Sequence, residues 1–91
     1  MQEYVLDFTE ARREDQIHEI LQKELDFPDY YGKNLDALWD CLTDWTSDPV
    51  RIILRGTSKL TGYAKKEMEE VLRIFERAAK QMKDFSCEIE S

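Results

Sequence analysis

Hydrophobic side chains recur along this chain at spacings that alternate between two residues and three or four, which divides it into strands and helices. Residues 2–8 alternate between apolar and polar positions, as a half-buried strand does. Residues 50–54, Val-Arg-Ile-Ile-Leu, are almost continuously apolar, which is typical of a middle strand in a parallel sheet. Residues 85–90 alternate again and predict a third strand, at an edge of the sheet.

Three segments show the apolar period of amphipathic helices. The first covers about residues 15–25, and Pro28 is expected to stop it because proline lacks a backbone N–H donor. The second covers about residues 35–45, and Asn34 is placed to cap its N-terminus. The third begins at about residue 63 or 65 and ends at about residue 82.

The order of these elements predicts the fold class. Strands that are joined through helices pair in parallel, with right-handed crossovers. A short helical turn is also expected at residues 58–62. We therefore predict a small α/β fold, in which three to four helices pack on a three-stranded parallel sheet. The length suits a single domain over residues 1–91 and is too short for two.

The segment 35–45 carries an unusual row of charge. Its apolar side chains form one stripe that is expected to face the core: Leu35, Leu38, Leu42 and Trp45. On the opposite side Asp36, Asp40 and Asp44 follow one another every four residues. Like charges at this spacing destabilise a helix by roughly 0.2–0.5 kcal/mol per pair. A helix that needed only solubility would place lysines between them, so the row indicates a binding surface.

Negative charge is concentrated around this helix. Residues 24–48 contain seven acidic side chains and one basic one, and so account for −6 of the chain's net charge of −7. This balance argues against nucleic acid or an anionic membrane as the direct partner. Four aromatic residues lie among the acids: Tyr30, Tyr31, Trp39 and Trp45. Anions combined with rigid aromatic side chains favour a cationic protein as the partner.

The stretch from Pro28 to Trp45 contains Tyr-Tyr-Gly-x-Asn-Leu-Asp-Ala-Leu-Trp-Asp-Cys-Leu-Thr. It resembles the signature of the barstar family, the intracellular inhibitors of barnase-type ribonucleases, and fainter similarity extends along nearly the whole chain. The resemblance implies a barstar-like fold and a heterodimer with a basic microbial ribonuclease. The inhibitor would occlude the cationic active site of that enzyme, and we expect the free protein to be monomeric.

Carried over residue by residue, the resemblance assigns Asp40 to the place of the RNA phosphate and Asp36 to a partner acid one turn earlier. Such carboxylates would form charge-assisted hydrogen bonds with arginines of the nuclease. The other expected contact residues are Tyr30, Gly32, Asn34, Trp39, Thr43, Trp45 and the additional acid Asp44. The family has a further acid on the last long helix, where this chain aligns Arg77 beside Glu76. Whether an acid contacts the partner from that helix stays open.

The acidic helix face does not suit catalysis or metal binding. A catalytic carboxylate pair needs a cleft that separates the two pKa values, and a hard-cation site needs oxygen ligands that converge. A convex helix face offers neither, so we expect no enzymatic activity, no metal and no cofactor. The alternative is an acidic binding or immunity module for another basic protein that is not a ribonuclease.

Several single residues complete the expectations. Gly32 is expected to adopt a backbone angle that other residues resist. His18, the only histidine, is expected at the surface or boundary of the first helix. Cys41 and Cys87 are expected to be reduced thiols. No signal peptide and no apolar run of about 20 residues is found, so a cytoplasmic location without membrane contact is expected.

Overall fold

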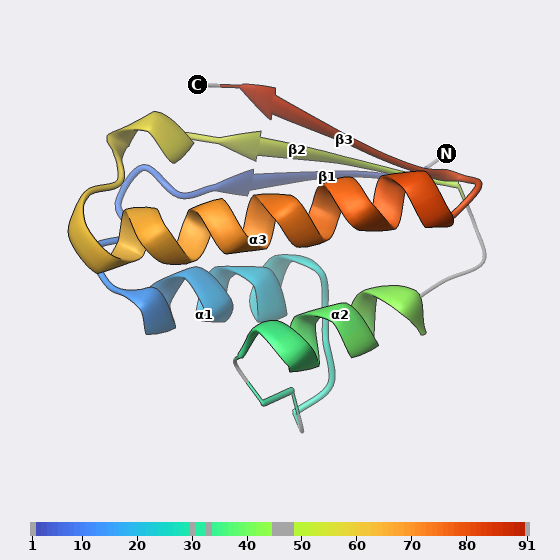
Figure 1. Cartoon of the computed structure of the whole chain (residues 1–91), viewed down its shortest axis with the longest axis horizontal. Helices are drawn as coiled ribbons and strands as arrows, with labels where there is room; N and C mark the ends of the chain where they lie inside the picture. Colours follow the sequence, from blue (N-terminus) through green and yellow to red (C-terminus); the bar gives the residue numbers. More distant parts are fainter. Residues whose placement is uncertain (1, 30, 33, 45–48, 91) are drawn as a thin grey trace.

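The computed structural model describes residues 2–29, 31–32, 34–44 and 49–90. Its elements follow the predicted order (Figure 1). They are β1 (Gln2–Asp7), α1 (Glu14–Glu24), α2 (Leu35–Thr43), β2 (Val50–Arg55), the 3₁₀ turn η1 (Thr57–Lys59), α3 (Gly62–Gln81) and β3 (Phe85–Glu90). The predicted boundaries therefore lie within a few residues of the observed ones.

The three strands form one parallel sheet in the order β1-β2-β3, which confirms the predicted α/β fold. β2 is the middle strand, and its Ile52 and Leu54 have no exposed surface. Ile53, on the other face, is only 8% exposed, so the apolar run of β2 is buried on both faces. Across that second face Arg51 donates hydrogen bonds to Glu3 of β1 and Glu88 of β3, at 3.2 and 2.6 Å.

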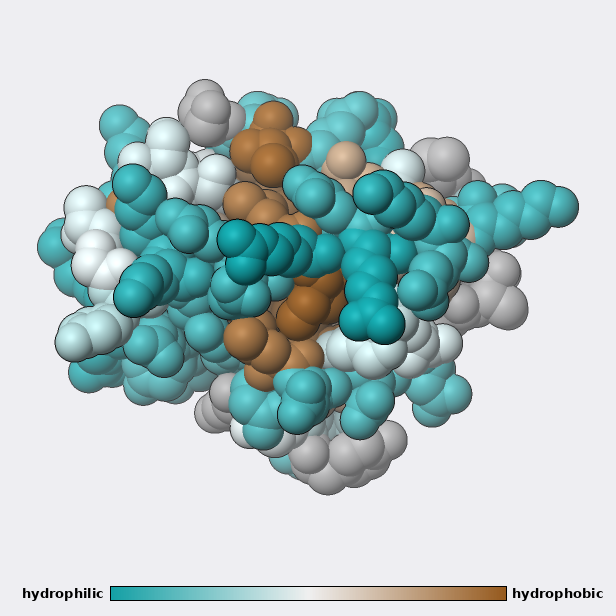
Figure 2. All heavy atoms as spheres, viewed as in Figure 1, coloured by the Kyte–Doolittle hydropathy of each residue, from teal (hydrophilic) through white to brown (hydrophobic). Residues whose placement is uncertain are grey.

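All three helices lie on one side of the sheet in Figure 1, and α3 runs between the strands and the other two helices in this view. The inner face of α3 supplies much of the core, since Val71, Phe75 and Ala78 have no exposed surface. Phe75 stacks on Phe85 of β3, with ring centres 6.1 Å apart. In the same view the surface is mostly hydrophilic, and a narrow apolar band crosses it over the middle of α3 (Figure 2).

The feature that ends α1 is not the one that the sequence predicts. Asp26 has a φ angle of 54°, in the left-handed region, and the Phe27 N–H donates to the Gln22 carbonyl at 3.0 Å. This arrangement ends a helix by turning the chain and satisfying a free carbonyl. The helix therefore ends at Glu24, and the left-handed Asp26 turns the chain before Pro28 is reached.

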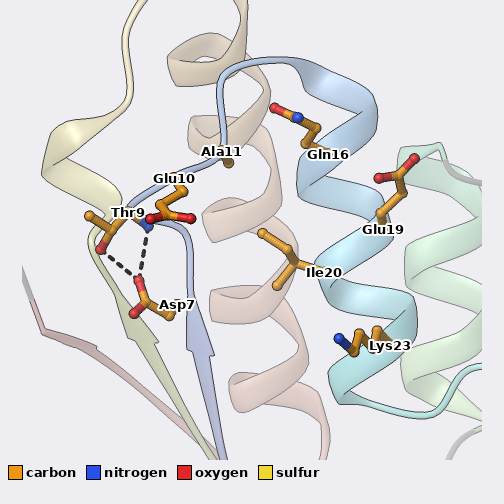
Figure 3. A pocket seen from close by; sticks show the side chains of 8 residues that line it. All are labelled: Asp7, Thr9, Glu10, Ala11, Gln16, Glu19, Ile20 and Lys23. Carbon is orange, nitrogen blue, oxygen red and sulfur yellow. Dashed lines mark hydrogen bonds between the residues drawn. The ribbon is translucent and has the colours of Figure 1, made fainter.

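The chain between β1 and α1 forms one wall of an open hollow of about 670 Å³, whose other wall is α1 (Figure 3). Asp7 braces that connection, because its Oδ1 accepts hydrogen bonds from the Thr9 hydroxyl at 2.6 Å and the Thr9 N–H at 2.9 Å. These bonds lower the pKa of the Asp7 carboxyl. Gly56, at the end of β2, lies against the same threonine.

Gly56 and Gly62 provide a matched test of that close contact. Both have positive φ angles, 77° and 62°. A Cβ at Gly56 would lie 2.8 Å from the Thr9 nitrogen, whereas a Cβ at Gly62 would meet nothing within 4 Å. Because the left-handed cost is common to both, we expect Gly56→Ala to lower the free energy of unfolding by about 1–3 kcal/mol more than Gly62→Ala. Urea denaturation measures the difference, and equal losses would contradict it.

Candidate partner-binding site

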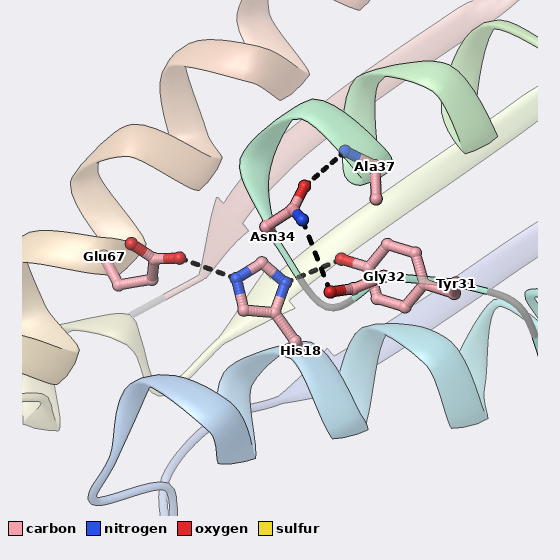
Figure 4. Close-up of polar contacts among 6 residues, drawn as sticks. All are labelled: His18, Tyr31, Gly32, Asn34, Ala37 and Glu67. Atoms are coloured by element: carbon pink, nitrogen blue, oxygen red, sulfur yellow. Dashed lines mark hydrogen bonds and ion pairs between the residues drawn. The ribbon is translucent and has the colours of Figure 1, made fainter.

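The N-terminus of α2 is held by the cap that the sequence predicts. The Asn34 Oδ1 accepts a hydrogen bond from the Ala37 N–H at 2.8 Å, and the Asn34 Nδ2 donates to the Gly32 carbonyl at 3.4 Å (Figure 4). The first bond satisfies an N–H group that a helix start leaves free. The same side chain therefore fixes both the helix and the loop that leads into it.

Gly32 does not adopt a backbone angle that other residues resist, so that prediction is wrong. Its φ lies outside the left-handed region, unlike those of Gly56 and Gly62. A Cβ at Gly32 would lie 3.3 Å from the Asn34 Nδ2 and 3.5 Å from the Ala37 Cβ. Glycine thus lets the loop approach the capping side chain closely.

The two sides of α2 differ as the sequence predicts. Leu38 and Leu42 have no exposed surface, and Leu35 packs against the core from a partly buried position. The acids of the opposite side, Asp36, Asp40 and Asp44, are all exposed. No cation of the described residues lies within ion-pair distance of these three carboxylates. Their charges therefore face solvent without neutralisation by that part of the chain.

Two of the other predicted contact residues on α2, Trp39 and Thr43, make contacts within the chain. Trp39 is partly buried, and the guanidinium carbon of Arg77 lies 4.5 Å from the centre of its ring. The Thr43 hydroxyl donates back to the carbonyls of Trp39 and Asp40, at 3.0 and 3.2 Å. It therefore braces the last turn of α2. The predicted contact residues Tyr30 and Trp45 lie outside the described residues.

The side chains of α3 show which residue joins this surface. Burial, and then the charges of Glu76 and Glu88, raise the pKa of the Cys87 thiol on β3 to about 11. Glu76 thus lies near enough to Cys87 of β3 for its charge to act on the thiol, while Arg77 contacts Trp39 of α2. Of these two neighbouring residues, Arg77 is the one that stacks on a side chain of α2.

His18 is 1% exposed, so the prediction of a surface or boundary position is wrong. Its Nδ1 lies 2.6 Å from the Tyr31 hydroxyl and its Nε2 lies 2.6 Å from the Glu67 Oε2 (Figure 4). Both ring nitrogens are satisfied, which makes burial tolerable. A sequence signal existed, because His18, Leu21 and Leu25 have the spacing of one helix face.

His18, Tyr31 and Glu67 form a hydrogen-bonded cluster, the His18 network. The donor and acceptor of each bond follow from the chemistry of these groups. A carboxylate only accepts, so the His18 Nε2 carries a proton and donates to Glu67, and in the neutral ring Nδ1 accepts from the Tyr31 hydroxyl. Burial, and then the charges of Cys41 and Glu67, raise the pKa of Tyr31 and keep its proton in place. The network joins α1, α3 and the loop before α2.

The described part of the chain contains no group of three or more His, Cys, Asp or Glu side chains placed to hold a metal ion. No helix in the same residues is long and apolar enough to cross a membrane. Cys41 and Cys87 are both free thiols. Burial, and then the charges of Asp40 and Asp44, raise the pKa of Cys41, so both thiols stay protonated at neutral pH.

Removing the Tyr31 hydroxyl tests the His18 network. Tyr31→Phe leaves the buried His18 Nδ1 without its hydrogen-bond partner, and we expect the free energy of unfolding to fall by about 1–3 kcal/mol. Tyr63→Phe is the control, because Tyr63 is 77% exposed and its change should be close to zero. Urea denaturation followed by circular dichroism measures both, and equal effects would argue against the network.

The orientation of Glu76 is tested by the reactivity of Cys87. Glu76→Gln removes an anion that disfavours the thiolate, so the pKa of Cys87 should fall and its alkylation by iodoacetamide at pH 8.5 should accelerate. In the unchanged protein the rate should keep rising with pH to about 11. Mass spectrometry of the alkylated peptide gives the rate. Exposed Glu69, changed to Gln, is the control, and an equal acceleration there would contradict the assignment.

Two comparisons with known proteins bear on this surface. The family model described as Barstar (barnase inhibitor) matches residues 1–90. The Bacillus subtilis (strain 168) protein named "Putative ribonuclease inhibitor YrdF" is 36% identical over 84 residues, which cover 92% of this chain and 92% of that protein. Both matches extend far beyond the stretch around α2. The chain belongs to the barstar family.

Proposed function

We propose that this protein is a ribonuclease inhibitor, which binds a barnase-type enzyme and covers its cationic active site with α2. The observation that carries the proposal is the exposed row of Asp36, Asp40 and Asp44, which pair with no cation of the described residues. The description of the family names barnase as the target, and the name of the Bacillus subtilis relative names a ribonuclease, which supports the same partner class.

The carboxylates of Asp40 and Asp36 would stand in for the phosphates of RNA. Residues four apart on a helix lie on one side and about 6 Å apart along its axis. Arginine and lysine side chains that bind phosphate in a ribonuclease can bind these carboxylates in the same way, through charge-assisted and often bidentate hydrogen bonds. The inhibitor performs no chemistry in this mechanism. It acts by occupying the site and excluding the substrate.

The surroundings of α2 make it suited to this task. Buried Leu38 and Leu42 fix the rotation of the helix, and Asn34 fixes its start. A surface that is ordered before binding loses less conformational entropy on association. The net charge of −7 would also attract a basic enzyme from a distance, so association should slow as the salt concentration rises.

The remaining contact residues would form the border of the interface. From the family resemblance, Tyr30 is the most important of them after the two aspartates. The others are Gly32, Asn34, Trp39, Thr43, Asp44 and Trp45. The hydroxyl of Thr43 is bonded to its own helix and the amide of Asn34 is used in the cap, so both would support α2 as well as meet the partner. The complex would be a heterodimer.

Titration into a barnase activity assay tests the proposal. We expect the unchanged protein to inhibit barnase, and Asp40→Ala to bind it more weakly, mainly through faster dissociation. The expected loss is about 2–5 kcal/mol, the range for truncated interfacial charge pairs, which was itself established partly on barnase with barstar. Glu10→Ala is the control, because it removes an exposed acid from the loop between β1 and α1 and should change the Kd less than threefold.

Two outcomes would count against the proposal. Full inhibition by Asp40→Ala would remove that residue from the interface. Binding of barnase without loss of its activity would favour the alternative, in which α2 is a docking surface for a basic protein and occludes no active site.

A further inference from the structure

Arg77 is a cation of α3 whose side chain contacts α2. Its side chain is exposed, and its guanidinium carbon lies 4.5 Å from the centre of the Trp39 ring on α2. A planar guanidinium stacks well on an aromatic face, and the stack restricts a side chain that would otherwise move freely. Arg77 is therefore held at a defined place over Trp39, which follows Asp36 by three residues and directly precedes Asp40 on α2.

The charge of Arg77 is left available. Within the described residues, four other arginines pair with acids: Arg13 with Asp15, Arg51 with Glu3 and Glu88, Arg55 with Glu90, and Arg73 with Glu70. Arg77 has no carboxylate of these residues within ion-pair distance. Its N–H groups lie in the plane of the guanidinium, so a stacked Arg77 can still donate them to a partner.

The neighbouring acid does not cancel this charge. Among the described residues Glu76 forms no ion pair with Arg77, and it lies near enough to Cys87 of β3 to raise the pKa of that thiol. The binding surface thus has two parts of opposite sign, a row of carboxylates on α2 and one fixed cation on α3. A wholly cationic partner would match the first part and be repelled by the second.

We propose that Arg77, held over Trp39, determines the specificity of this inhibitor by selecting a ribonuclease that carries a carboxylate at the rim of its cationic cleft, opposite α3. The inference rests on the proposed function and names the chemistry of the partner's rim. An enzyme with a carboxylate there gains an ion pair with Arg77. An enzyme with a cation there places two like charges together, and such juxtaposed charges exclude wrong partners.

Barnase can serve as the probe. Each residue around its active-site cleft is replaced by Asp in turn, and the Kd of every form is measured against the unchanged inhibitor and against Arg77→Glu. At one or two adjacent rim positions, Asp should tighten binding of the unchanged protein and weaken binding of Arg77→Glu. The double-mutant cycle should give a coupling of at least fivefold there.

Two further variants separate charge from structure. Arg77→Met keeps an unbranched side chain over Trp39 without the charge, and its affinities should lie between those of the other two proteins. Lys65→Glu makes the same change of charge about three helical turns earlier on α3, and it should show no coupling. Urea denaturation checks that each variant is folded.

The outcomes are distinguishable. Coupling below fivefold at every rim position, in an inhibitor that binds barnase, would overturn the role of Arg77 and leave the proposed function standing. Equal coupling for Lys65→Glu would also overturn it, because net charge would then explain the effect. If neither the unchanged protein nor Arg77→Glu bound any form of barnase, the proposed function would fail and the role of Arg77 with it.

Discussion

The burial of one stripe of α2 is the constraint on which the surface of this protein depends. A helix of nine residues is too short to be stable alone in water, so its packing against the rest of the chain must hold it. Leu38 and Leu42 provide that packing and have no exposed surface. Because side chains rotate by about 100° per residue, fixing these two leucines also fixes where the aspartates point. The repulsion within the aspartate row is then offset by burial on the other side.

The His18 network adds a directional constraint to this packing. Apolar contacts tolerate small shifts, whereas hydrogen bonds of 2.6 Å to both nitrogens of one ring define positions in three segments. Tyr31 lies in the loop just before the cap of α2, so the network fixes the chain where it enters the helix. A buried polar group is costly unless it is satisfied, which makes the arrangement selective for one geometry.

The sequence predicts what depends on local order and misses what depends on contact between elements. The apolar run of β2, the Asn34 cap and the two sides of α2 follow from periodicity and helix chemistry, and the structure has all three. The helix face of His18 could have signalled its burial, but its hydrogen-bond partners lie 13 and 49 residues away in the chain, and no local pattern reveals them.

The same limit applies to α3 and to the loop before α2. The helical period of α3 cannot decide whether Arg77 or Glu76 contacts α2, because both residues border the apolar stripe of α3. The sequence also cannot show why a glycine stands at position 32, since glycine is used both for positive φ angles and for close approach of the backbone to other groups. The φ angle of Gly32 and the position of the Asn34 side chain distinguish these two reasons, and both come from the structure.

The outer face of the sheet has a consequence for how this protein behaves among its own copies. β1 and β3 are edge strands, and unpaired edges can recruit strands from other molecules. Exposed acids occupy both edges, Glu3 and Asp7 on β1 and Glu88 and Glu90 on β3, and the cations of this face lie on the middle strand. A second copy that approached edge to edge would bring carboxylates against carboxylates. These edge acids are separate from the aspartate row of α2, and charged side chains on edge strands disfavour pairing between copies of a small, open sheet.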